Sequence, residues 1–107
     1  MDENDFRKRS DQALTSLKQA LITAEESADF EVEDQAGALH VSFEDGGRFV
    51  ISPNAPVRQI WVSARVKSFK LDWDEARGAF VLPADGRTLL QLIADVVGEQ
   101  MGEVVSL

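Results

Sequence analysis

The chain has 107 residues, enough for one domain with one hydrophobic core, and it has no cysteine, which excludes disulfides, thiolate metal sites and a cysteine nucleophile. Nineteen acidic and eleven basic residues give a net charge of −8, which argues against a nucleic-acid partner and favours metal cations or a basic protein. No apolar run reaches the length of a membrane span and the acidic N-terminus is unlike a targeting signal, so we expect a soluble globular protein.

The first predicted element is a helix from residue 3 to about residue 25. Acidic residues at its start suit the positive end of the helix dipole. Its apolar residues recur at a spacing of three to four, as on one face of a helix: Phe6, Ala13, Leu17, Leu21 and Ala24.

After this helix the apolar period changes to two, which is typical of strands. Runs of this kind, separated by turn-forming residues, predict six strands over residues 30–33, 39–43, 49–52, 57–63, 69–73 and 79–82. In the fourth strand, Ile60 and Val62 should face the core, so Trp61 should face the other side together with Gln59. Trp73 has the parity of core residues in the fifth strand and is predicted to be buried.

Asp85 is the predicted N-cap of a closing helix, whose apolar stripe runs from Leu89 to Val97 and which Gly102 should end. Short turns make consecutive strands antiparallel neighbours. Each helix has one apolar side and the sheet has one apolar face. The predicted fold class is therefore α+β: a two-layer sandwich in which the N- and C-terminal helices pack on one face of a roughly six-stranded antiparallel sheet, as a single domain over residues 1–107.

The excess negative charge is confined to the first half of the chain. Residues 1–45 hold twelve acids and four bases, a net charge of −8, whereas residues 46–107 hold seven of each. The densest stretch, residues 25–34, has no base and six acids: Glu25, Glu26, Asp29, Glu31, Glu33 and Asp34. Such carboxylates repel one another and suit hard cations such as Fe²⁺, Mn²⁺ or Ca²⁺. The alternative is a solvated acidic face that maintains solubility.

His40 and Trp61 are the other two candidates. If the Asp34–Gly37 turn has Gln35 and Ala36 at its tip, His40 lies opposite Glu31, as an ion pair, as half of a metal site, or as a plain surface histidine. Trp61 on the face without helices would suit a partner-binding anchor, and partial burial by its strand neighbours is the alternative.

No catalytic constellation is recognisable. The chain has one histidine, no Gly-x-Ser-x-Gly turn and no phosphate-binding glycine loop, and Gly46-Gly47 reads as a hairpin turn. We therefore expect a protein that is not an enzyme.

Several segments resemble the frataxin family, and its bacterial CyaY branch in particular. They are Pro56–Ser63 with its Gln59-Ile60-Trp61 core, Leu71-Asp72-Trp73, Asp85–Leu89, Leu39–Gly46 and Gly102–Ser106. The resemblance covers nearly the whole chain. It implies the α+β sandwich already predicted, a cytoplasmic bacterial protein, and a role in iron–sulfur cluster assembly.

The resemblance also implies the site residues. Iron, as Fe²⁺ or Fe³⁺, would bind weakly at the surface on an acidic ridge, and no organic cofactor is expected. The matching ridge residues are Glu25, Glu26, Asp29, Glu31 and Glu33. The cysteine desulfurase and the iron–sulfur scaffold protein are the implied partners, and the matching partner-binding residues are Gln59, Trp61, Glu31 and Glu33.

Two functions follow from this resemblance. One is an iron chaperone that also regulates cluster assembly, and the other is an interaction module with no significant iron binding of its own. The chain should be a monomer, with an iron-dependent oligomer as the alternative. The helical part of the ridge is thin, because Lys18, Gln19, Ile22 and Thr23 stand where relatives usually carry acids. Ser52 likewise stands where relatives often have asparagine.

Overall fold

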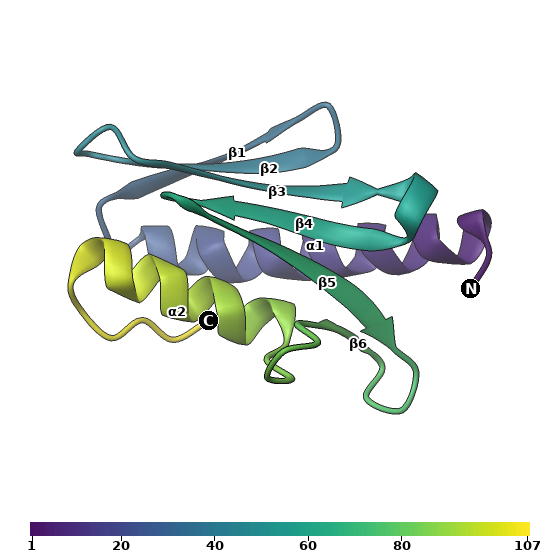
Figure 1. Cartoon of the computed structure of the whole chain (residues 1–107). Helices are drawn as coiled ribbons and strands as arrows, with labels where there is room; N and C mark the ends of the chain where they lie inside the picture. The colour runs from purple at the N-terminus through teal and green to yellow at the C-terminus, as the bar shows by residue number, and fades with distance from the viewer.

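A computed structural model describes all 107 residues. Along the chain, one helix precedes and one helix follows a run of six strands (Figure 1). The elements are α1 (Glu3–Glu25), β1 (Phe30–Gln35), β2 (Ala38–Phe43), β3 (Arg48–Asn54), the 3₁₀ turn η1 (Ala55–Val57), β4 (Gln59–Ala64), β5 (Lys67–Asp74), β6 (Ala79–Val81) and α2 (Leu89–Met101). All strand pairs are antiparallel, and each strand pairs with its neighbours in the chain. The predicted fold class is confirmed. Neither helix is long and apolar enough to cross a membrane.

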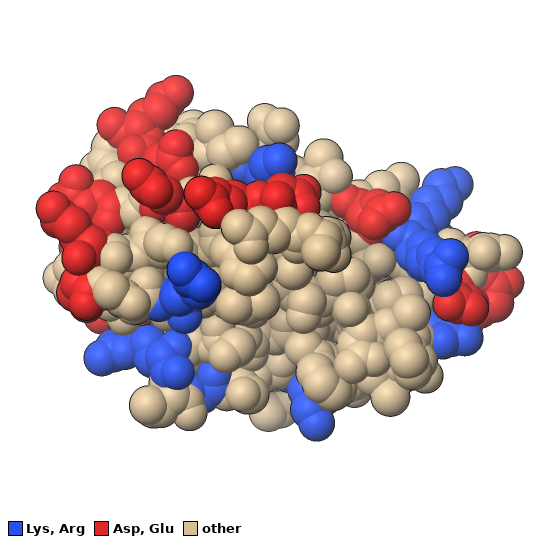
Figure 2. Space-filling view, turned by 90° about the horizontal axis from the view of Figure 1, so that it is seen from above, with Lys and Arg blue, Asp and Glu red and all other residues tan.

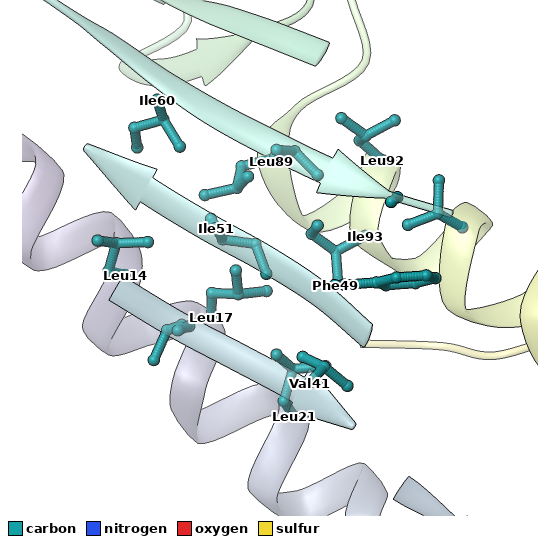
Figure 3. Packing of buried hydrophobic residues seen from close by; sticks show 14 of the residues in the cluster. Leu14, Leu17, Leu21, Val41, Phe49, Ile51, Ile60, Leu89, Leu92 and Ile93 are labelled. Carbon is teal, nitrogen blue, oxygen red and sulfur yellow. The ribbon is translucent and has the colours of Figure 1, made fainter. Parts of the chain in front are cut away.

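The core lies between the two helices and one face of the sheet (Figure 3). Side chains alternate across a strand, so every second strand residue enters this layer, whereas the helices contribute residues spaced by three or four. Both helices and the sheet contribute fully buried residues, which include Leu17, Leu21, Phe49, Ile51, Ile60, Leu92 and Ile93. Each buried side chain of this size contributes about 2 kcal/mol of transfer free energy, so these residues fix which face of the sheet is covered.

The closing helix begins later than predicted. Its N-cap is Thr88 and not Asp85: the Thr88 hydroxyl accepts a hydrogen bond from the Gln91 N–H, and the Gln91 side chain accepts one from the Thr88 N–H. This capping box satisfies two backbone donors at once, whereas Asp85 is separated from the helix by Gly86, whose φ is +78°. A hydrogen bond from the Arg87 backbone N–H lowers the pKa of Asp85. Gly102 ends the helix as predicted, with a φ of 71°.

The fourth strand is shorter than predicted. Val57 belongs to η1, and Arg58 adopts a left-handed conformation with a φ of 55°, so the strand starts at Gln59. From there the predicted faces are confirmed, because Ile60 and Val62 are buried while Trp61 is exposed.

Candidate functional site

The face of the sheet opposite the helices, here called the outer face, carries a mixed set of polar side chains. Strand register places Glu31 opposite Ser42 and Glu33 opposite His40 at the β1 edge. Towards the middle, Trp61 lies opposite Ser52 on one side and opposite Lys70 on the other. The outer face therefore changes from acidic at β1 to aromatic and basic at β4 and β5.

Trp61 lies on this face as predicted, and its orientation is held by neighbouring side chains. The residue is 37 % exposed. Its indole Nε1–H donates to Gln59 Oε1 at 2.9 Å, and Gln59 Nε2 in turn donates to Asp72 Oδ1 at 3.0 Å. Lys70 Nζ lies 4.9 Å from the ring centroid, in cation–π geometry. The indole is thus accessible to a partner and already oriented before binding.

Lys70 and Asp72 are members of this cluster that the sequence reasoning missed. Their alternate spacing on β5 is a signal in the sequence that could have identified them, because it places Lys70 opposite Trp61 and Asp72 opposite Gln59. Finding it requires the register of β4 with β5, which the tight turn at Arg65-Val66 fixes. The candidate site therefore spans two strands rather than one.

Trp73 faces the other side of the sheet, as predicted, and is half-buried there. Its ring packs edge-on against Phe80, with 5.2 Å between the ring centroids, and Arg9 lies over its face at 4.8 Å. Its indole N–H donates to the Glu75 carboxylate. These contacts make Trp73 part of the margin of the core.

Four exposed carboxylates make up what we call the acidic edge: Glu26, Asp29, Glu31 and Glu33. None of them forms an ion pair, and Glu33 accepts a side-chain hydrogen bond from Gln35 Nε2 at 3.1 Å. Figure 2 looks down on the β1 side of the molecule and shows acidic side chains in a band that is densest at the end where α1 finishes. The acids of residues 25–34 therefore lie on the side of the molecule where α1 ends and β1 begins.

Glu25 and Asp34 differ from those four carboxylates because each has a partner within the protein. Glu25 Oε2 accepts a hydrogen bond from the Val32 backbone N–H at 3.0 Å, and Asp34 lies 3.8 Å from Lys18 Nζ. Since β1 is an edge strand, the Glu25 carboxylate satisfies a backbone donor that no other strand reaches. Glu25 thereby joins the end of α1 to β1.

His40 lies opposite Glu33, and the predicted pairing with Glu31 is wrong. The β1–β2 turn has two residues, Ala36 and Gly37, with φ values of 53° and 83°, so Gln35 pairs with Ala38. The tip of the turn thus lies one residue later than Gln35-Ala36, which moves the partner of His40 by two residues along β1 and leaves His40 on the same face. Its Nδ1 atom is buried and makes no hydrogen bond within the protein.

Nowhere do three histidine or carboxylate side chains come close enough together to hold one metal ion. The acidic edge instead presents its carboxylates singly, on a strand face and a helix end. Carboxylates arranged in this way attract cations and basic surfaces through their combined field, with little selectivity from geometry.

Comparison with known proteins supports a family assignment. The frataxin-like domain family matches residues 1–103. The iron–sulfur cluster assembly protein CyaY of Azotobacter vinelandii is 38% identical over 97 residues, which are 89% of this chain and 88% of that protein. Among solved structures, the frataxin of Psychromonas ingrahamii is similar with a TM-score of 0.85 at 19% identity, covering 99% of this chain and 97% of that one.

A second solved structure shares the fold at greater distance. Trimeric frataxin from the yeast Saccharomyces cerevisiae, complexed with ferrous iron, is similar with a TM-score of 0.74 at 21% identity. The match covers 89% of this chain and 87% of the yeast chain. Since the family match covers almost the whole chain and the bacterial relatives match in sequence as well as in fold, the chain belongs to the frataxin family, in its branch of CyaY iron–sulfur cluster assembly proteins.

Proposed function

We propose that this protein is an iron-binding regulator and iron chaperone of iron–sulfur cluster assembly that docks on the cysteine desulfurase–scaffold complex. The observation that carries the proposal is the outer face of the sheet, where an oriented, exposed Trp61 and the unpaired carboxylates of Glu31 and Glu33 occupy one uncovered surface. The names of the bacterial relatives supply the process in which this surface works.

The acidic edge and Trp61 have different roles in docking. Exposed carboxylates steer a basic patch of the desulfurase towards the β1 side and set the orientation of the encounter. Trp61 then buries its remaining exposed area against the scaffold protein. Because the Gln59 and Lys70 contacts already hold the indole, little rotational freedom is lost on binding.

Iron is cargo in this proposal. Fe²⁺ and Fe³⁺ are hard cations that prefer carboxylate oxygens, and Asp29, Glu31 and Glu33 offer such oxygens without an internal counter-ion. Each ion would contact one or two carboxylates and keep much of its water, so binding is weak and release is easy. The yeast frataxin complexed with ferrous iron lends support to iron as the metal.

The alternative function is an interaction module with no significant iron binding. It is favoured by the internal contacts of Glu25 and Asp34, which remove two of the six acids in residues 25–34 from the set free to bind iron. In this case the same surface docks on the complex as a monomer and changes its rate without delivering metal.

The docking proposal is tested by binding to an immobilised, purified desulfurase–scaffold pair. Trp61→Ala should weaken binding about tenfold, the size expected for loss of an interface anchor. Leu90→Ala is the matched control, because Leu90 on α2 is 38 % exposed against 37 % for Trp61 but lies on the helix layer. Wild-type binding should also weaken as salt is raised from about 50 to about 500 mM. Equal binding of Trp61→Ala and wild type would contradict the anchor role.

The two functions are separated by anaerobic titration of Fe²⁺, followed by broadening of backbone amide signals. Iron binding predicts broadening in residues 26–34 that is lost in the triple variant D29N/E31Q/E33Q. The control D11N/E99Q/E103Q removes the same charge from exposed, unpaired acids elsewhere and should retain the effect. Glu25 is left intact because it holds the Val32 N–H. No broadening, or equal broadening in both variants, would favour the interaction module. Sedimentation velocity of the same samples shows whether iron converts the monomer into an oligomer.

A further inference from the structure

A group of basic residues lies at one end of the sheet. Arg48 begins β3, Arg65 stands in the turn between β4 and β5, and Lys67 begins β5. The register pairs Phe49 with Ala64 and Ala64 with Lys67, so three neighbouring strands bring these residues to the same end of the sheet. Because side chains alternate along a strand, Arg48 lies on the outer face and Lys67 on the helix side of this end, with the β4–β5 turn between them. We call Arg48, Arg65 and Lys67 the basic corner.

The three cations of the basic corner have no counter-ion. The ion pairs of the protein use Arg7, Lys18 and Arg87, and four further bases lie against an aromatic ring or donate to a backbone carbonyl. Outside the corner, Lys8 on α1 alone has no such partner. The corner stays unpaired although the chain has nineteen acids for eleven bases and although Glu44 and Asp45 lie in the adjacent β2–β3 turn. Asp45 is occupied by hydrogen bonds from Gly47 and Gln100.

An apolar side chain stands between two of these cations. Val66 is 98 % exposed at the tip of the β4–β5 turn, between Arg65 and Lys67. Arg65, the first residue of this two-residue turn, has a φ of 59°, a conformation that favours glycine. The turn therefore lacks the glycine that its backbone favours at Arg65, and it exposes the apolar side chain of Val66 at its second position. An exposed valine flanked by two unpaired cations offers a partner one apolar contact between two sites for carboxylates.

We infer that the basic corner, with Val66 at its centre, is a second docking surface that binds an acidic segment of a partner protein. The segment would cross the tip of the β4–β5 turn, with carboxylates on Arg48 at the outer face, on Arg65 in the turn and on Lys67 at the helix side, and with an apolar side chain on Val66. Charge complementarity supports this occupant, because the cations are free. A nucleic acid fits less well than a short acidic segment, because an extended polyanion would also meet the acidic side chains that Figure 2 shows at the same end of the molecule.

The two docking surfaces have opposite sign. The acidic edge runs from the end of α1 onto β1, and the basic corner starts at β3, with β2 between the two strands. A partner that presents a basic patch and an acidic segment side by side could bind in one orientation only, because the reversed orientation would place like charges together. The inference does not depend on iron or on Trp61.

The test is a titration of the ¹⁵N-labelled protein with an acetylated peptide of four glutamates flanking two leucines, at low salt. We expect shift changes at residue 48 and residues 63–68. Arg65→Glu combined with Lys67→Glu should weaken binding about fivefold or more, as loss of two exposed ion pairs implies. Val66→Ser should weaken it less and should leave the thermal unfolding midpoint unchanged. The control Arg7→Glu with Lys8→Glu makes the same change of charge on α1 and should bind as wild type does.

Two results would overturn the inference. One is shift changes outside the corner, or equal peptide binding by the Arg65→Glu/Lys67→Glu variant and wild type. The other is tighter binding, through the same residues, of a single-stranded oligonucleotide or of vesicles with phosphatidylserine than of the peptide, which would make the corner a phosphate-binding surface.

Discussion

The two tryptophans stand on adjacent strands and on opposite faces of one sheet, and their surroundings differ accordingly. Trp73 lies under the N-terminal part of α1, against Phe80 and Arg9. Trp61 lies on the face that no helix covers, with Gln59 and Lys70 as its neighbours. Both indole N–H groups find an acceptor two residues away in the chain, so hydrogen bonding does not distinguish them.

The difference between them is what each ring covers. Trp73 excludes water from the edge of the core, so its removal should affect folding. Trp61 covers only neighbouring outer-face side chains, so its removal should affect binding. The comparison separates a residue that supports the fold from one that is available to a partner, and each of the following substitutions tests one side of it.

The largest effect is expected for Trp73→Ala. Removal of the ring takes away one of the two edge-on partners of Phe80 and opens the core margin, so the free energy of unfolding should fall by about 3 kcal/mol. Urea denaturation measures this change. Trp73→Phe, which retains an aromatic ring, should lose about 1 kcal/mol. A Trp73→Ala protein as stable as wild type would show that the covered face does not depend on this ring.

A smaller effect is expected for Gln59→Ala. This change removes the acceptor of the Trp61 N–H and the donor to Asp72, at a cost of about 1 kcal/mol in the free energy of unfolding. The Trp61 indole signal should shift and its side chain should become more mobile on the nanosecond timescale, as measured by NMR relaxation. Ser63→Ala on the same strand and face makes no side-chain hydrogen bond to lose and should leave the indole unchanged.

The smallest effect on folding is expected for Trp61→Ala itself. Because the ring is exposed and lies on other outer-face side chains, its loss should change the free energy of unfolding by about 0.5 kcal/mol. Urea denaturation beside Trp73→Ala gives the direct comparison. If the two variants lost equal stability, the distinction between the two faces would be wrong.

Most of the fold follows from the sequence because its information is local. Alternation at Leu39, Val41 and Phe43 and at Ile60 and Val62 assigns faces without knowledge of the rest of the molecule, and it placed Trp61 on the bare side correctly. The order of short turns then leaves few alternatives to a meander.

Errors arose where two local signals competed. Asp85 and Thr88 are both good N-cap residues, and Gln91 three positions after Thr88 decides between them. The β1–β2 turn could hold its tip at several residues, and the left-handed conformation of Ala36, which is uncommon for alanine, placed it at Ala36-Gly37. That one choice moved the partner of His40 from Glu31 to Glu33.

The candidate site was predicted only in part because its contacts join distant elements. The charge count locates the acids in residues 25–34 but does not show that Glu25 bonds to the Val32 N–H or that Asp34 reaches Lys18. Likewise, the sequence places Trp61 outside the core but does not reveal the contact with Lys70 on the next strand. Register and helix docking create these contacts.

The order of the strands also bears on how the chain reaches its native state. Each strand pairs with the one before it in the sequence, so the sheet can grow hairpin by hairpin, and each step closes a loop of only a few residues. The docking of α1 against β5, β6 and α2 joins the two ends of the chain. Helix docking is therefore the step with the largest entropic cost of loop closure, and substitutions between the helices should change folding kinetics differently from substitutions within any single hairpin.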